Sequence, residues 1–240
     1  MQIPCGFLFD HFGPRRTVTG MLILATIGGA IFTLAPNWPV LREGLASVGV
    51  TLTVQKEVPC FYATLPTVWA GYLEAKSQHF RKRWNNTRNR FHREGTVALR
   101  FAPQDVPVDE AYAELLRLHG DRWGEGGGGF RSDAKIRFHR EICHRFARQG
   151  WLVLVLMTLN GKTVAARYDF RYGGKIWGNQ GGWSSELQSL KLGENFIAQL
   201  MEWGTGQGLA EYDFLGGAAE YKERWSTGGR TMLEVEGFSP

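Results

Sequence analysis

Cysteine is scarce in this chain of 240 residues, which holds only Cys5, Cys60 and Cys143. Their number is odd, they lie far apart and none belongs to a Cys-x-x-Cys pair, so neither a disulfide framework nor a zinc site is suggested. We expect a reducing, cytoplasmic setting for the main domain and no bound metal. With 43% hydrophobic and 21% charged residues, the chain is not disordered, and its length suits one domain plus an appendage.

Acidic side chains are absent from residues 76–93, which contain seven Lys or Arg. A helical pattern runs over residues 68–93, with Phe80, Trp84 and Phe91 at roughly helical spacing. Two interpretations stay open: a solvated basic face over a packed aromatic stripe, or a contact with phosphate, RNA or acidic lipid. The net charge of +5 and the pI near 9.2 allow an anionic partner without choosing one.

Charged side chains are also absent from residues 17–35, an apolar run just long enough to span a bilayer. Residues 6–16 before it resemble the loop between transmembrane helices two and three of major facilitator transporters. The resemblance ends near residue 36, so this chain cannot transport anything alone. We expect residues 1–36 to be a fusion remnant or a membrane anchor. The orientation of such an anchor stays open. Arg15 and Arg16 would place the N-terminus in the cytoplasm and the main domain outside, whereas the basic residues downstream indicate the opposite orientation.

Residues 37–66 are expected to be a linker that leads into a main domain of residues 67–240. A strand at 96–101 and helices at 109–123 and 133–149 come first. Gly124 to Gly129 formally satisfies G-x-G-x-x-G, but it follows a helix, so we expect a mobile loop over a site rather than a dinucleotide motif.

Three strands follow, joined by Asn160-Gly161 and Gly173-Gly174, which are strong hairpin signals. The first, at 151–159, is apolar throughout, as for a central strand covered on both faces. The second, at 164–172, alternates apolar residues with Arg167, Asp169 and Arg171. These strands form an antiparallel meander. A helix at about 193–206, a strand at 210–214, a helix at Tyr221 and a strand at 231–236 complete the chain.

A strand ending in a carboxylate, a glycine turn and a short helix follow one another in residues 211–225. The helix presents Tyr221 and Lys222 together. A phenol can protonate a leaving group, and an ammonium can hold the negative charge that develops on a carbonyl, so the pair suits group transfer. The alternative is that the tyrosine packs and the lysine is solvated.

This order of elements resembles that of the GNAT acyltransferase fold, and several short motifs point the same way. They are Leu118-His119, Arg122-Trp123, Phe138-His139-Arg140-Glu141, Gly161, Val164-Ala165-Ala166, Gly193, Gly208, Asp213-Phe214-Leu215, Gly217, Tyr221-Lys222 and Trp225. In these residues the chain resembles the BioF-like branch of the GNAT superfamily, which includes CelD-type cellulose-biosynthesis proteins and lies close to the FemAB peptidyltransferases. The resemblance covers about residues 59–237 and implies an α+β fold, a mixed, mostly antiparallel sheet flanked by helices, with the N-terminal apolar helix appended.

The resemblance also implies acyl-CoA, for example acetyl-CoA, as co-substrate, with its pyrophosphate on a helix N-terminus after the fourth strand. The residues at that place are Leu190, Lys191, Leu192, Gly193, Glu194 and Asn195. The family's Q/R-x-x-G-x-G/A motif is not intact here, and Lys191-Leu192-Gly193 stands where relatives often carry Ser-Pro-Gly. Gly193 could instead simply permit close packing at a helix start.

For catalysis, the resemblance implies direct attack of an amine on the thioester. Tyr221 is placed like the GNAT tyrosine that protonates the departing thiolate, and Lys222 like the FemAB lysine that stabilises charge. Asp213, at the carboxyl end of a strand, is our candidate base, with His119 and Glu186 as weaker ones.

The leading interpretation is a GNAT-like N-acyltransferase that uses acyl-CoA and an amine-bearing small molecule, such as an amino sugar or glycan precursor. The first alternative is FemAB-like aminoacyl transfer from charged tRNA, with the basic helix as the RNA contact. The second is a non-catalytic binding module attached to a membrane through residues 17–35.

Overall fold

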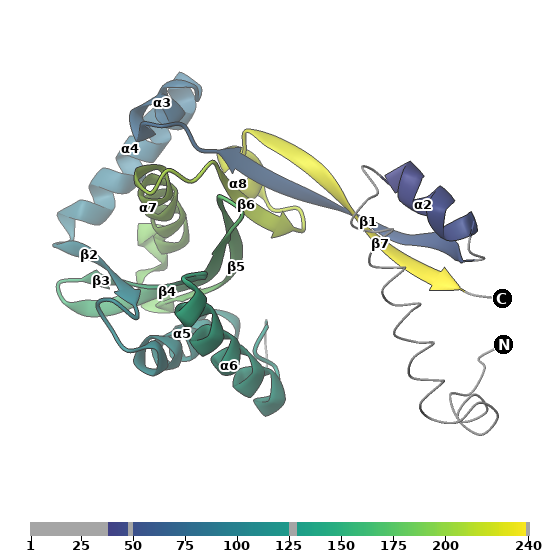
Figure 1. The fold of residues 1–240 in the computed structure, drawn as a ribbon. Helices are drawn as coiled ribbons and strands as arrows, with labels where there is room; N and C mark the ends of the chain where they lie inside the picture. Colours follow the sequence, from purple (N-terminus) through teal and green to yellow (C-terminus); the bar gives the residue numbers. More distant parts are fainter. Residues whose placement is uncertain (1–37, 48–49, 125–128, 239–240) are drawn as a thin grey trace. The chain divides into compact units, whose positions relative to one another are not determined.

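The chain is drawn in Figure 1 from a computed structural model that describes residues 38–47, 50–124 and 129–238. The apolar segment 17–35 and most of the glycine run 124–129 lie outside these residues. Among the helices that the structure describes, none is both long and apolar enough to cross a membrane.

Two compact units divide the chain, and their boundary falls within β1 (Thr51–Thr64) and β7 (Gly228–Phe238). One unit comprises residues 1–58 and 232–240; its described part contains α2 (Trp38–Ser47), and Gln55 Nε2 donates to Glu236 Oε2 at 3.0 Å. The other unit, residues 59–231, contains the end of β1, the start of β7 and all the other helices and strands described below.

A seven-stranded sheet has the order β2-β3-β4-β5-β6-β1-β7. Besides β1 and β7, its strands are β2 (Val97–Ala102), β3 (Leu152–Leu159), β4 (Lys162–Tyr172), β5 (Lys175–Trp183) and β6 (Glu211–Gly216). Strands β2 to β5 are antiparallel neighbours, β5 and β6 run parallel, and β6 and β1 run antiparallel. This confirms the mixed, mostly antiparallel sheet. The two turns of the meander lie at Asn160-Gly161 and Gly173-Gly174, where all four residues have positive φ.

Helices cover both faces of the sheet (Figure 1). On one face lie α5 (Val108–Trp123) and α6 (Asp133–Gln149), and on the other α4 (Gln78–Arg93) and α7 (Leu192–Gly206). Strand β3 contributes side chains to the core on both faces of the sheet. Val153 and Val155 pack with α4 and α7, whereas Leu154 and Leu156 pack with α5. Successive strand residues point to opposite faces, so an unbroken apolar run is what a strand between two helical layers needs.

Strand β1 lies within residues 37–66, for which the sequence predicts a linker and entry segment rather than a strand. Most side chains of β1 up to Val58 are exposed, so no apolar alternation marks the strand. Its end pairs with β6, with Tyr62 opposite Asp213 and Ala63 opposite Tyr212. The single helix expected at 68–93 is also interrupted: α3 (Trp69–Glu74) ends, and Ser77 begins α4 by accepting a hydrogen bond from Phe80 N at 3.2 Å.

Candidate active site

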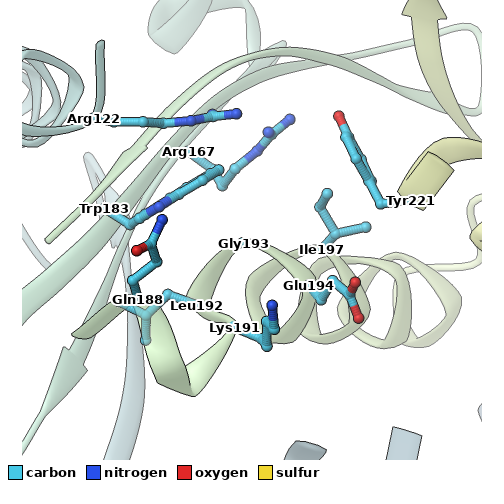
Figure 2. A pocket seen from close by; sticks show the side chains of 10 residues that line it. All are labelled: Arg122, Arg167, Trp183, Gln188, Lys191, Leu192, Gly193, Glu194, Ile197 and Tyr221. Atoms are coloured by element: carbon cyan, nitrogen blue, oxygen red, sulfur yellow. The ribbon is translucent and has the colours of Figure 1, made fainter. Parts of the chain in front are cut away.

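The sheet opens between its two parallel strands. Pairing of β5 with β6 ends at Trp177 and Asp213, although β5 continues to Trp183 and β6 to Gly216. Beyond that point lies a cavity of about 60 Å³, lined by Arg167, Gly178, Asn179, Ile197, Tyr212, Phe214, Tyr221 and Lys222. A larger cavity of about 300 Å³ shares Arg167, Ile197 and Tyr221 with it and continues along the start of α7. Figure 2 shows the lining of the larger cavity.

Tyr221 contributes to both cavities. It is the second residue of α8 (Glu220–Trp225), and its ring lies edge-on to Phe214 with a centroid distance of 6.4 Å. Its hydroxyl points toward the guanidinium groups of Arg122 and Arg167 (Figure 2). The structure therefore places the expected proton donor in a cavity.

Lys222 faces the smaller cavity, but its ammonium is engaged. Its Nζ donates to the carbonyl oxygens of Leu215 at 3.2 Å and Gly216 at 2.8 Å. Leu215 has a φ of 56°, an uncommon conformation for a residue with a branched side chain. Burial lowers the pKa of Lys222, and the nearby charge of Arg167 acts in the same direction, while Cys60 and Asp213 oppose it. Lys222 thus holds the turn that leads to Tyr221.

The three candidate bases line neither cavity. Asp213 is 2% exposed, and its Oδ1 accepts a hydrogen bond from Leu215 N at 2.7 Å, so its carboxylate stabilises the same turn. His119 is buried against Phe130, and this burial lowers its pKa. Glu186 is exposed in the 3-10 helix η1 (Ser185–Leu190).

The start of α7 forms one wall of the larger cavity, through Lys191, Leu192, Gly193 and Glu194. No side chain caps this helix, and we find no acceptor among the described residues for the N–H groups of residues 192–194. Unpaired N–H groups and the helix dipole favour an anion. The residues present therefore suit a phosphate-bearing co-substrate at this end of the cavity.

Leu190 and Asn195 do not line the cavity but shape this wall. Leu190 is part of the core, and buried Asn195 donates through Nδ2 to the carbonyl oxygens of Leu190 at 2.9 Å and Lys191 at 3.4 Å. Lys191 adopts a left-handed conformation with φ 52°. At Gly193 a Cβ atom would lie 2.9 Å from Cζ3 of Trp183, so the glycine permits close packing and also faces the cavity.

Arg122 and Arg167 were not expected in the site, yet both line the larger cavity. Two signals pointed to them: Arg122 belongs to one of the motifs that carry the GNAT resemblance, and Arg167 alternates with Asp169 on β4. Glu194 is the acidic side chain in the lining of this cavity. It pairs with Arg224 and lies 3.6 Å from Arg83.

Among the described residues no group of three His, Cys, Asp or Glu side chains could hold a metal ion.

Residues 78–223 match the family model described as "Acetyltransferase (GNAT) domain". No curated protein matches the sequence. Among solved structures, FemX aligns with a TM-score of 0.60 and 13% identity, covering 80% of this chain and 66% of FemX. L-PGS from Bacillus licheniformis aligns with a TM-score of 0.54 and 15% identity, over 82% of this chain and 65% of that one.

A third structure is the C-terminal domain of a putative lysylphosphatidylglycerol synthetase from Agrobacterium fabrum. It has a TM-score of 0.53 and 11% identity, and the alignment covers 82% of this chain and 64% of that domain. The chain thus spans 64 to 66% of the length of these three structures. At such low identities the likeness shows the fold alone.

Proposed function

Because the chain belongs to the GNAT acetyltransferase family, we propose that it transfers an acyl group from acyl-CoA to an amine, such as that of an amino sugar or glycan precursor. The observation that carries this proposal is the shared cavity of about 300 Å³, which brings the hydroxyl of Tyr221 and the uncapped start of α7 to one space.

Acyl-CoA, when bound, supplies the acyl group as a thioester together with a pyrophosphate. The N–H groups of residues 192–194 and the ammonium of Lys191 would bind the pyrophosphate. Tyr221 would donate its proton to the sulfur as the carbon–sulfur bond breaks and the carbon–nitrogen bond forms. In net terms one proton passes from the amine to the sulfur, and the products are an amide and a free thiol.

Thiol release tests the proposal, since every transfer from acyl-CoA frees one thiol. The full chain is incubated with acetyl-CoA and a panel of amines, and thiol is measured with and without each amine. We expect release that depends on the amine and is weakened by Lys191→Ala, which removes a charge next to the expected pyrophosphate site. Lys162→Ala, an exposed residue at the start of β4, is the matched control. No amine-dependent release with any acyl-CoA would contradict the proposal.

The basic surface of α4 favours a second candidate, aminoacyl transfer from charged tRNA. Lys82, Arg88, Arg90 and Arg93 are exposed, and we find no acidic partner for them among the described residues. One solved structure with a similar fold is named as a domain of a putative lysylphosphatidylglycerol synthetase, and this name is consistent with transfer of an aminoacyl group. In this case tRNA binding would weaken steeply with salt, because phosphate contacts release counterions, and removal of these charges would reduce the slope.

A further inference from the structure

The wall of the larger cavity that faces Tyr221 carries two guanidinium groups, those of Arg122 and Arg167 (Figure 2). Each is close enough to Tyr221 and to the other for their charges to interact. Two cations side by side away from bulk water repel each other unless anions lie near them. The partners of each arginine therefore decide what the cavity can bind.

Arg167 is only 8% exposed and is held rigidly. Its Nη2 donates to Asp169 Oδ1 at 2.6 Å and to Tyr212 Oη at 3.0 Å, and its Nε donates to Asp169 Oδ2 at 3.3 Å. Tyr212 Oη and the backbone N–H of Asn179 also donate to Asp169, at 2.8 and 2.9 Å. Asp169 thereby balances the charge of Arg167, while Nη1 has no acceptor among the described residues.

Arg122 has no such counter-ion. Its guanidinium lies 3.5 Å from the ring centroid of Trp183 and 4.2 Å from that of Trp123, and Nη1 donates to the carbonyl oxygen of Gly181 at 3.1 Å. No carboxylate lies within salt-bridge distance of it in the described part of the chain. Burial, together with the charge of Arg167, lowers the pKa of Arg122 to about 10, so it remains a cation at neutral pH.

The position of Arg122 is fixed by the packing of α5 on β5. At Gly182 a Cβ atom would lie 2.2 Å from His119 N, so only glycine allows the helix to come this close to the strand. Arg122 lies one helical turn after Leu118, and its stacking between two indoles restricts its rotamers. The guanidinium is thus preorganised with donors still free, and bidentate binding of carboxylate or phosphate is what such a group does best.

We propose that the acceptor carries a carboxylate or phosphate group, which Arg122 and Arg167 bind while its amine faces Tyr221. This inference rests on the proposed acyl transfer, because it assigns the start of α7 to the donor and the arginine wall to the acceptor. Figure 2 shows these two walls on different sides of the cavity, with Lys191 and Gly193 on α7 and the two arginines across from them.

Paired acceptors test the inference in the full chain. Glucosamine 6-phosphate is compared with glucosamine, and alanine with ethylamine, so that phosphate and carboxylate are judged separately. We expect kcat/KM to be at least about 100-fold higher for the anionic member of one pair, since sites built around buried charges reject ligands that leave them unpaired. Arg122→Gln should remove most of this preference through KM, and Arg122→Lys should retain part of it.

Arg117→Gln is the matched control, because Arg117 lies on the same helix, is exposed and pairs with Glu114. Equal use of both members of each pair by the wild type would overturn the inference, as would Arg122→Gln lowering kcat equally for all amines or weakening acetyl-CoA binding as much as acceptor binding. Direct titration with inorganic phosphate and with acetate separates this inference from the proposed reaction. Binding that Arg122→Gln abolishes, without any thiol release, would support the anion site and contradict the acyl-CoA reaction.

Discussion

Tyr221 and Lys222 are neighbours in the chain but have different surroundings. The tyrosine hydroxyl reaches the larger cavity, whereas the lysine ammonium is bound by two carbonyl oxygens of the preceding turn. The residue types alone suggested a catalytic pair. We therefore propose that the tyrosine takes part in the reaction and that the lysine positions this tyrosine.

Tyr221→Phe is expected to lower kcat by a factor of about 10² to 10⁴, the usual contribution of a well-placed general acid. The substitution keeps the ring that contacts Phe214 and removes only the hydroxyl, so acetyl-CoA affinity and the unfolding midpoint should not change. Steady-state kinetics with calorimetric titration measure both properties. Wild-type turnover in this variant would show that the tyrosine only packs.

Lys222→Met is expected to lower the free energy of unfolding by about 1 to 3 kcal/mol, because it keeps the apolar stem but deletes two charge-assisted hydrogen bonds. Turnover should fall with it, since the turn carries Tyr221. Denaturant unfolding and kinetics measured together check this. A large loss of turnover with no loss of stability would instead support the direct role in charge stabilisation that the sequence suggested.

Between elements, one carboxylate links α5 to two side chains of α6. Asp109, in the first turn of α5, accepts hydrogen bonds from Arg140 Nε at 2.8 Å and His144 Nε2 at 2.9 Å, both on α6. Hydrogen bonds from Arg140 and then His144 lower the pKa of Asp109 to about 2. The folded state therefore favours the charged carboxylate.

Asp109→Asn should make stability less dependent on pH in acid. A carboxyl group whose folded pKa is depressed stabilises the fold above its ordinary pKa near 4, and that contribution is lost as the pH falls to about 2. The difference in unfolding midpoint between the wild type and the variant should thus shrink between pH 4 and pH 2. A constant difference over this range would show that the contacts of Asp109 do not depend on its charge.

How far the elements could be predicted depends on how each one is buried. The meander was predictable because β3 is apolar on both faces and its turns carry Asn-Gly and Gly-Gly. Strand β1 was not, because its first half exposes most of its side chains and leaves no alternation. In the site, Tyr221 and Lys191 to Glu194 line a cavity, whereas Asp213 does not, and only the fold shows that its carboxylate accepts a hydrogen bond from Leu215 N. Arg122 reaches the cavity only because Gly182 lets α5 approach, which is a contact between distant residues.

At the scale of the molecule, the two buried core clusters in the described part of the chain are formed by residues between Ala63 and Trp225. Deletion of residues 1–36 should therefore leave a single cooperative thermal transition, and we expect better solubility because the apolar run 17–35 is removed. Differential scanning calorimetry of the shortened and full chains measures this. Loss of the cooperative transition would show that these residues belong to the folded domain.

Calorimetric titration of the full chain with acetyl-CoA tests the central claim most directly, because that claim requires the uncapped start of α7 and Tyr221 to face one donor site. We predict saturable binding with a Kd between about 1 µM and 1 mM, the range typical of enzyme substrates, that Lys191→Ala weakens and Tyr221→Phe leaves unchanged. Absence of binding at millimolar acetyl-CoA, together with a salt-sensitive complex with aminoacyl-tRNA, would contradict the account and support tRNA as the donor.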